Sequence, residues 1–146
     1  MNARIELYAL GLPAPKGSKR HVGNGVMVES SKRVKPWQKA VAAACRDTYR
    51  GNPLTGPVSL TVEFYLPRPV AHMGTGRNAG QVKPSAPIWH VTMPDLDKTL
   101  RSTGDALTGL AYVDDRQIVA IHAHKHYSDA AHPVGASILI DSLERP

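Results

Sequence analysis

Hydrophobic and polar residues alternate along several segments of this chain, and that pattern predicts its strands. The clearest alternation covers residues 58–66, where every second residue is apolar, as expected for a strand with one buried face. Weaker alternation predicts strands over residues 5–10, 117–127 and 135–141, and residues 26–28 favour a short additional strand. A sheet with one buried face needs a cover of helices on that face.

Two other segments have apolar residues at helical spacing. Residues 36–50 begin with a proline in the first turn, end at Gly51, and carry the stripe Trp37, Val41, Ala44, Cys45 and Tyr49. The second helix starts after Asp95 and ends at about Gly109, with the stripe Leu96, Leu100, Thr103 and Leu107. We therefore predict one α+β domain over residues 1–146. It has two layers: a mixed β-sheet of four to five strands, and two main helices packed on one face.

Two segments rich in glycine and proline are predicted to be loops that carry basic residues. The first, residues 13–25, contains Lys16, Lys19 and Arg20, and is either a basic arm that contacts phosphates or an ordinary solvated loop. The second, residues 67–90, contains Arg77, Lys83 and Trp89. Its indole either anchors the loop to the core, which we favour, or stacks on a base.

The charge of the chain is unevenly distributed. Residues 1–50 carry ten Lys and Arg against three Asp and Glu, whereas residues 95–146 carry five against eight, within a net charge of +6. A basic surface attracts phosphate backbones, and an acidic cluster in a basic chain suggests a cation held near a polyanion. The single cysteine, Cys45, excludes an internal disulfide and lies on a helical core stripe. With no signal peptide and no membrane-length apolar run, we expect a cytoplasmic protein.

The acidic cluster lies in residues 93–118, which hold five of the eight aspartates. Asp95 and Asp97 open the second helix, and Asp114 and Asp115 precede the next strand. Each pair has a structural explanation, since aspartates cap helices and form turns. Two acidic pairs separated by one helix also suit Mg²⁺, which takes hard oxygen ligands and keeps several waters. Such an ion supports phosphodiester hydrolysis, and a neighbouring Arg101 or Lys98 is placed to neutralise transition-state charge.

The residues P-D-L-D-K-T-L-R-S-T-G-D-A-L-T-G-L-A-Y-V-D-D-R-Q-I resemble the signature of the RusA family of Holliday junction resolvases, common in bacteriophages and prophages. Weaker resemblance extends to the P-K-G-S-K-R loop and to R-N-A-G-Q-V-K-P-S-A-P. The resemblance implies a Mg²⁺-dependent endonuclease, with Mn²⁺ as a possible substitute, acting as a homodimer on branched DNA in recombination and repair.

Carried over residue by residue, the resemblance makes Asp95, Asp97 and Asp115 the metal-binding carboxylates. The catalytic basic position of the family falls on Arg101, where the best-known form has lysine; arginine stabilises phosphate charge but does not readily transfer protons. Lys98 could compensate. Asp114 is a neighbour without an assigned role, and Asp105 has a structural or supporting one. The expected DNA contacts are Lys16, Lys19, Arg20, Arg77, Lys83 and Lys98.

Three alternatives stay open at this point. A nuclease of the same fold could prefer flaps or replication forks to four-way junctions. A non-catalytic DNA-binding module could retain the carboxylates for stability. Finally, His122, His124 and His126 share one face of a strand by alternation, and two of them could bind zinc. We favour a polar sheet face or a DNA-facing surface over this metal site.

Overall fold

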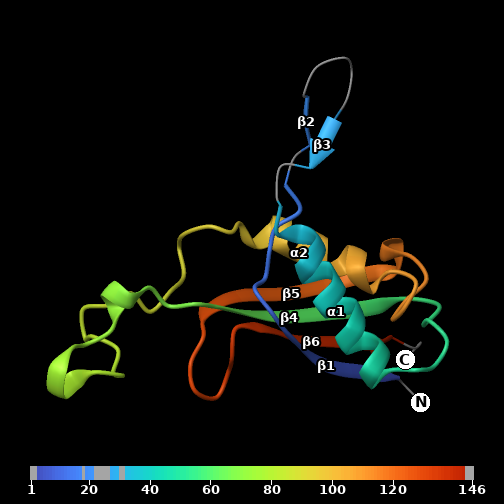
Figure 1. Ribbon diagram of the computed structural model, residues 1–146. Coiled ribbons are helices and arrows are strands. Elements are labelled where there is room, and N and C mark those ends of the chain that lie inside the picture. Colours follow the sequence, from blue (N-terminus) through green and yellow to red (C-terminus); the bar gives the residue numbers. More distant parts are fainter. Residues whose placement is uncertain (1–2, 18, 22–26, 30–31, 144–146) are drawn as a thin grey trace.

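The computed structural model describes residues 3–17, 19–21, 27–29 and 32–143, with the side chains of residues 19–21 and 27–29 excepted. A four-stranded sheet forms its centre, in the order β1-β6-β4-β5 (Figure 1). β4 is parallel to β5, while β6 is antiparallel to both of its neighbours, so the sheet is mixed as predicted. The strands are β1 (Arg4–Leu10), β4 (Val58–Leu66), β5 (Ile118–Tyr127) and β6 (Gly135–Ser142).

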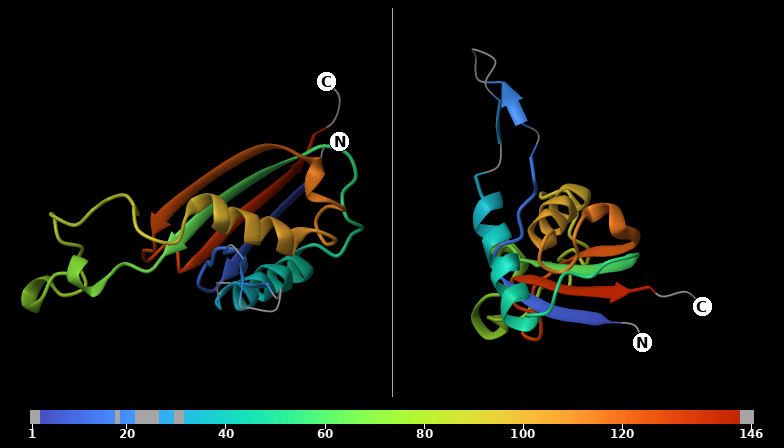
Figure 2. Two further views of the ribbon diagram at one scale, coloured as in Figure 1. Left: turned by 90° about the horizontal axis from the view of Figure 1, so that it is seen from above. Right: turned by 90° about the vertical axis from the view of Figure 1, so that its right-hand side faces the viewer.

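Two helices, α1 (Val34–Thr48) and α2 (Leu96–Leu107), lie on the same side of this sheet, which confirms the predicted α+β architecture (Figure 2). The residues of β4 alternate strictly as the sequence predicts: the apolar residues are buried, and the residues between them are half-buried. The buried core joins this face to α1 and α2, and it contains Ile5, Leu7, Trp37, Val41, Cys45, Leu60, Val62, Phe64, Leu107, Tyr112, Ile138 and Ile140.

The two helices are also joined by polar contacts. The indole Nε1 of Trp37 donates to Thr103 Oγ1 at 3.0 Å, and Gln38 Nε2 donates to the carbonyl of Ser102 at 3.0 Å. Burial raises the pKa of the Cys45 thiol, which suits a structural residue and not a nucleophile. No helix in the described part of the chain is long and apolar enough to cross a membrane.

The first predicted loop is not entirely irregular. β2 (Lys19–His21) pairs with β3 (Met27–Glu29) in a small antiparallel sheet that stands away from the main one (Figure 1). The loop prediction was therefore wrong for residues 19–21, and the short strand predicted at 26–28 occurs one residue later. Gly and Pro content predicts turns well, but a strand of three residues is too short to show a clear alternation.

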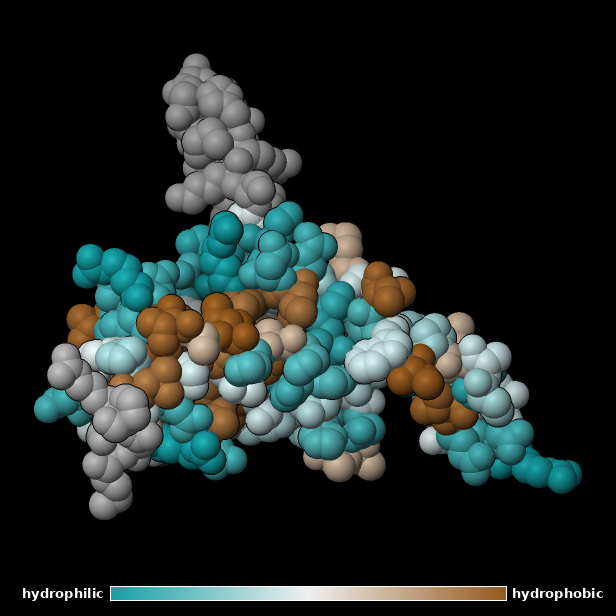
Figure 3. Space-filling model, turned by 180° about the vertical axis from the view of Figure 1, so that it is seen from behind, coloured by the Kyte–Doolittle hydropathy of each residue, from teal (hydrophilic) through white to brown (hydrophobic). Residues whose placement is uncertain are grey.

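The second predicted loop projects beyond the sheet as a long excursion between β4 and α2 and contains two short 3₁₀ helices, Val70–His72 and Gly76–Asn78 (Figures 1 and 2). Figure 3 shows hydrophobic surface on it, and Trp89 is 64% exposed. Trp89 therefore does not anchor the loop, contrary to our expectation. Arg68 does so instead, since its guanidinium lies 4.1 Å from the centre of the Tyr127 ring and donates to the carbonyl of Pro87 at 2.9 Å.

Candidate active site

The carboxylate of Asp95 does not cap the helix that it precedes. Asp95 is the N-cap residue of α2, but its side chain accepts no hydrogen bond from the first turn. It lies 3.3 Å from the Nζ of Lys98 instead. The start of the helix is held by Thr99, whose hydroxyl donates to the backbone carbonyl of Asp95 at 2.7 Å. The local structure thus leaves this carboxylate available to another partner.

Asp97 and Arg101 follow on the exposed face of α2. Their spacing of four residues permits an ion pair, but none joins them in the structure; nor does either make a salt bridge to any other residue in the described ranges. A carboxylate and a guanidinium therefore lie close together on one solvent-facing surface without neutralising each other.

The first residues of the basic loop, residues 13–25, lie against α2. The amide of Lys16 donates to the carbonyl of Lys98 at 3.1 Å, and the hydroxyl of Ser102 donates to the carbonyl of Ala14 at 2.6 Å. The Nζ of Lys16 lies 2.7 Å from Asp105 Oδ2. One of the expected DNA contacts, Lys16, thus has its charge paired within the protein. The side chains of Lys19 and Arg20 lie outside the described residues, and Arg77 and Lys83 are exposed on the excursion.

The two adjacent aspartates near the far end of α2 have different environments. Asp114 caps the 3₁₀ helix Asp115–Gln117: its side chain accepts from the amide of Arg116, and Gln117 Oε1 accepts from the Asp114 amide, both at 2.8 Å. The backbone hydrogen bond from Arg116 lowers the pKa of the Asp114 carboxyl. Gln117 also donates to the carbonyls of Leu54 and Gly56 at 2.8 Å. Asp115, by contrast, is exposed and makes no salt bridge to a described residue.

Tyr112 connects this turn to α2. Its ring is fully buried, and its hydroxyl donates to the carbonyl of Gly104 at 2.7 Å. Burial raises the pKa of the Tyr112 hydroxyl, and the negative charges of Asp115 and Asp105 raise it further. Because the hydrogen bond of this hydroxyl reaches Gly104, it ties the segment before Asp114 and Asp115 to the second half of α2. Asp95, at the N-cap, is ten residues before Asp105, which is roughly 15 Å along a helix axis.

Lys125 is a site residue that the sequence analysis missed. It lies between His124 and His126 on β5, and therefore faces the helix side of the sheet. Its Nζ donates to the carbonyls of Thr92 at 2.8 Å and Pro94 at 2.9 Å, directly before Asp95. A cationic residue on the helix-facing side of a strand could have indicated Lys125. The sequence analysis considered only the opposite face of this strand, which carries the histidines.

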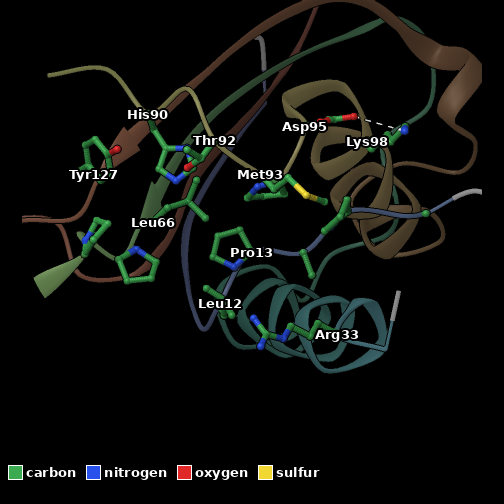
Figure 4. Close-up of a pocket in the computed structure, with 16 residues that line it drawn as sticks. Leu12, Pro13, Arg33, Leu66, His90, Thr92, Met93, Asp95, Lys98 and Tyr127 are labelled. Atoms are coloured by element: carbon green, nitrogen blue, oxygen red, sulfur yellow. Dashed lines mark ion pairs between the residues drawn. The ribbon is translucent and has the colours of Figure 1, made fainter. Parts of the chain in front are cut away.

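A pocket of about 670 Å³ opens beside the start of α2 (Figure 4). Asp95 and Lys98 lie at one end of it, and apolar residues such as Leu12, Leu66 and Met93 line its wall. His90 also lines it: the side chain is buried, and its Nδ1 has no hydrogen-bond partner among the described residues. Burial lowers the pKa of His90, with a further contribution from the charge of Lys125, so the ring is neutral near pH 7.

The three predicted metal ligands do not form one compact group. In the part of the chain that the structure describes, the group of three or more His, Cys, Asp or Glu side chains whose ligand atoms all lie within 4.8 Å of one another is Glu63, His124 and His126. Asp95 and Asp97 are neighbours at one end of α2, while Asp115 lies beside its other half. Carboxylate oxygens are nevertheless the donors that Mg²⁺ prefers, and it needs few of them because it usually keeps several waters.

Comparison with known proteins supports the resemblance of the central motif. Residues 11–137 match the family described as Endodeoxyribonuclease RusA, a range that covers most of the chain. The chain is also similar to the uncharacterized protein YqaN of Bacillus subtilis (strain 168). The two are 28% identical over 127 residues, which is 86% of this chain and 89% of YqaN.

Proposed function

Because the chain belongs to the RusA family of endodeoxyribonucleases, we propose that it is a Mg²⁺-dependent enzyme that resolves four-way DNA junctions by paired nicks. One observation carries this proposal: the residues of the acidic motif, 93–118, fall into two groups that differ in their contacts. Asp114, Gln117 and Tyr112 are fully used in holding the local structure. Asp95, Asp97 and Asp115 are exposed carboxylates that have no such use.

This difference in contacts indicates that the three exposed carboxylates, Asp95, Asp97 and Asp115, have a chemical role. In this proposal Asp95, Asp97 and Asp115 are the carboxylates of the metal site, and Mn²⁺ could replace Mg²⁺ because both take oxygen ligands. When bound, the ion supplies a Lewis acid for the phosphoryl oxygen and a more acidic water. Carboxylates used only for stability would be expected to cap or to pair, and these do neither, apart from the contact between Asp95 and Lys98.

Three basic residues near these carboxylates have different proposed roles. Arg101 is exposed and unpaired among the described residues, so it is available to stabilise negative charge on a phosphate. Lys98 shares its charge with Asp95 and borders the pocket, where it can orient that carboxylate and contact the DNA backbone. Lys125 acts on the backbone before Asp95 and fixes the position at which α2 begins.

Two-fold symmetry would complete the activity. A four-way junction is resolved by two symmetric nicks, and a homodimer supplies two identical sites related by an axis. The basic first third of the chain would provide phosphate contacts, which position a branched substrate with few base contacts.

The decisive experiment is a nicking assay on a synthetic four-way junction, with Mg²⁺ and with EDTA. We expect the wild type to cut only with Mg²⁺, and Asp97→Asn to bind the junction normally but to cut it at least about 100-fold more slowly. Asp47→Asn is a matched control, since it makes the same change at an exposed position of α1. Tight binding without cutting by the wild type would favour a non-catalytic DNA-binding module, and cutting of flaps but not junctions a flap nuclease.

A further inference from the structure

A group of side chains suited to a transition metal lies on the side of the sheet opposite to the helices. In the parallel pair of β4 and β5, Glu63 is level with His124, and Tyr65 is level with His126. The buried residues of β4 face the helices, so Glu63 and the residues level with it face away from them. This side also carries His122, which is level with Thr61.

The atoms of the group already lie close together. Glu63 Oε1 is 3.1 Å from His124 Nδ1, and Glu63 Oε2 is 2.6 Å from His126 Nε2. Ligand atoms of all three residues lie within 4.8 Å of one another. In a tetrahedral site with metal–ligand bonds of about 2.1 Å, neighbouring ligand atoms are roughly 3.4 Å apart. Small rotations of three side chains would therefore suffice to place them around one ion.

The surroundings restrict the motion of one of these ligands. The ring of His126 stacks on Tyr65 with 5.2 Å between centres, and Tyr65 stacks on His132 at 4.5 Å with an angle of 5° between their planes. Glu63 and His126 have side chains that are 30% and 33% exposed, whereas His124 is 57% exposed. The group is thus held from one side by the aromatic stack and open to solvent on the other.

We propose that Glu63, His124 and His126 form a second metal site, specific for a divalent transition-metal ion such as Zn²⁺. Two imidazoles and one carboxylate match zinc and related ions and not Mg²⁺, which prefers oxygen ligands alone. Such an ion would take the place of the hydrogens that now join the two rings to the carboxylate. A fourth position remains open to water or to a ligand.

The site would tie an edge strand to its neighbour. β5 is at the end of the strand order, and among the strands that the structure describes it pairs only with β4. An ion held by Glu63 from β4 and by two histidines from β5 clamps the two strands together. Since the ion binds the folded chain, it should raise the melting temperature in proportion to the logarithm of its concentration.

Calorimetric titration of the untagged, metal-free full chain with ZnCl₂ tests the site. We expect one ion per chain, still bound in the presence of excess Mg²⁺, and a rise in Tm of roughly 8 °C at 100 times the Kd. His124→Gln and His126→Gln should each weaken Zn²⁺ binding at least about tenfold. His122→Gln is the matched control, with the same change on the same strand and side, and should bind as the wild type does.

Three results would overturn the site: no saturable binding of one Zn²⁺ per chain, equal losses in all three histidine variants, or no loss in any of them. Circular dichroism of each metal-free variant checks that it is folded. Glu63→Gln, which keeps the shape and hydrogen-bonding capacity of the side chain, provides a second variant that must also lose affinity. Asp97→Asn should retain full Zn²⁺ binding, so this test is independent of the nuclease proposal.

Discussion

The two ends of α2 contain equally acidic sequence but use it differently. At the start, Asp95 and Asp97 neither cap the helix nor complete a buried network. Beyond the far end, Asp114 accepts a capping hydrogen bond and belongs to a network that Gln117 extends to Leu54. The comparison teaches that an aspartate-rich motif is not functionally uniform. Hydrogen bonding within the fold separates the aspartates that build the site from those available for chemistry.

This difference predicts that activity and stability respond to separate residues of the same motif. Substitution of an available carboxylate should reduce the cutting rate and leave the melting temperature nearly unchanged. Substitution of a structural residue should do the reverse.

The adjacent pair Asp114 and Asp115 gives the largest expected effect. Asp115→Asn should slow junction cutting about 100-fold or more, because it removes a proposed ligand of the ion, and it should leave Tm unchanged. Asp114→Ala should lower Tm by a few degrees through loss of the cap, with cutting within a few-fold of wild type. The measurements are single-turnover nicking and thermal unfolding. Equal losses of activity in the two variants would remove the proposed division of roles.

Lys125 tests whether the start of α2 also depends on a structural residue. Lys125→Met removes the donors to the carbonyls of Thr92 and Pro94, so Asp95 should be placed less accurately. We expect cutting to slow about tenfold, as is typical when a residue that orients a metal ligand is lost. Junction affinity in a gel-shift assay should be unchanged. Lys125→Arg keeps charge and donors and should recover part of the rate; if it is as slow as Lys125→Met, positioning through these carbonyls is not the cause.

The sequence predicted the parts of this molecule that depend on local periodicity. The bounds of β4 and the apolar stripe of α2 follow from alternation and helical spacing, because burial of one face imposes those patterns directly. Membership of the nuclease family also followed from the motif alone. The roles of Thr99 and Ser102 could not be predicted from the motif. The Thr99 hydroxyl donates to the carbonyl of Asp95, and the Ser102 hydroxyl donates to the carbonyl of Ala14, a contact between distant parts of the chain.

Long-range pairing explains what was missed. The contacts of Lys125 with Thr92 and Pro94 require the packing of the segment before α2 against β5. The meeting of Glu63 with His124 and His126 requires the register between two parallel strands that are distant in sequence. Alternation placed the three histidines on one side of a strand, but nothing in it indicated which carboxylate lies opposite. The predicted meeting of Asp95, Asp97 and Asp115 stays a prediction, because it depends on how the turn after α2 lies against the helix.

Substitution of Tyr112 gives the smallest expected effect, and it tests whether a structural residue of the motif affects stability without affecting cutting. Tyr112→Phe removes the hydroxyl and leaves the carbonyl of Gly104 buried without this partner, which should lower the free energy of unfolding by about 1–2 kcal/mol near pH 7. Cutting should be unaffected apart from that loss. Urea unfolding at constant temperature measures the first quantity, and nicking below the melting range measures the second.

The pH dependence of stability, compared between wild type and Tyr112→Phe, also tests the structural role of Tyr112. Burial raises the pKa of Tyr112 above its ordinary value of 10.0, so the folded protein binds the hydroxyl proton more tightly than the unfolded chain does. The corresponding stability is fully present below about pH 10 and is lost as the pH rises from there towards the folded-state pKa. Wild type should therefore lose stability above pH 10 more steeply than Tyr112→Phe, which lacks the titrating group, and the two unfolding curves should converge. If the free energies of unfolding of the two proteins stay parallel above pH 10, burial does not raise the pKa of Tyr112. The hydroxyl would then be accessible to solvent, and its hydrogen bond to Gly104 would stabilise the far end of α2 less than we expect.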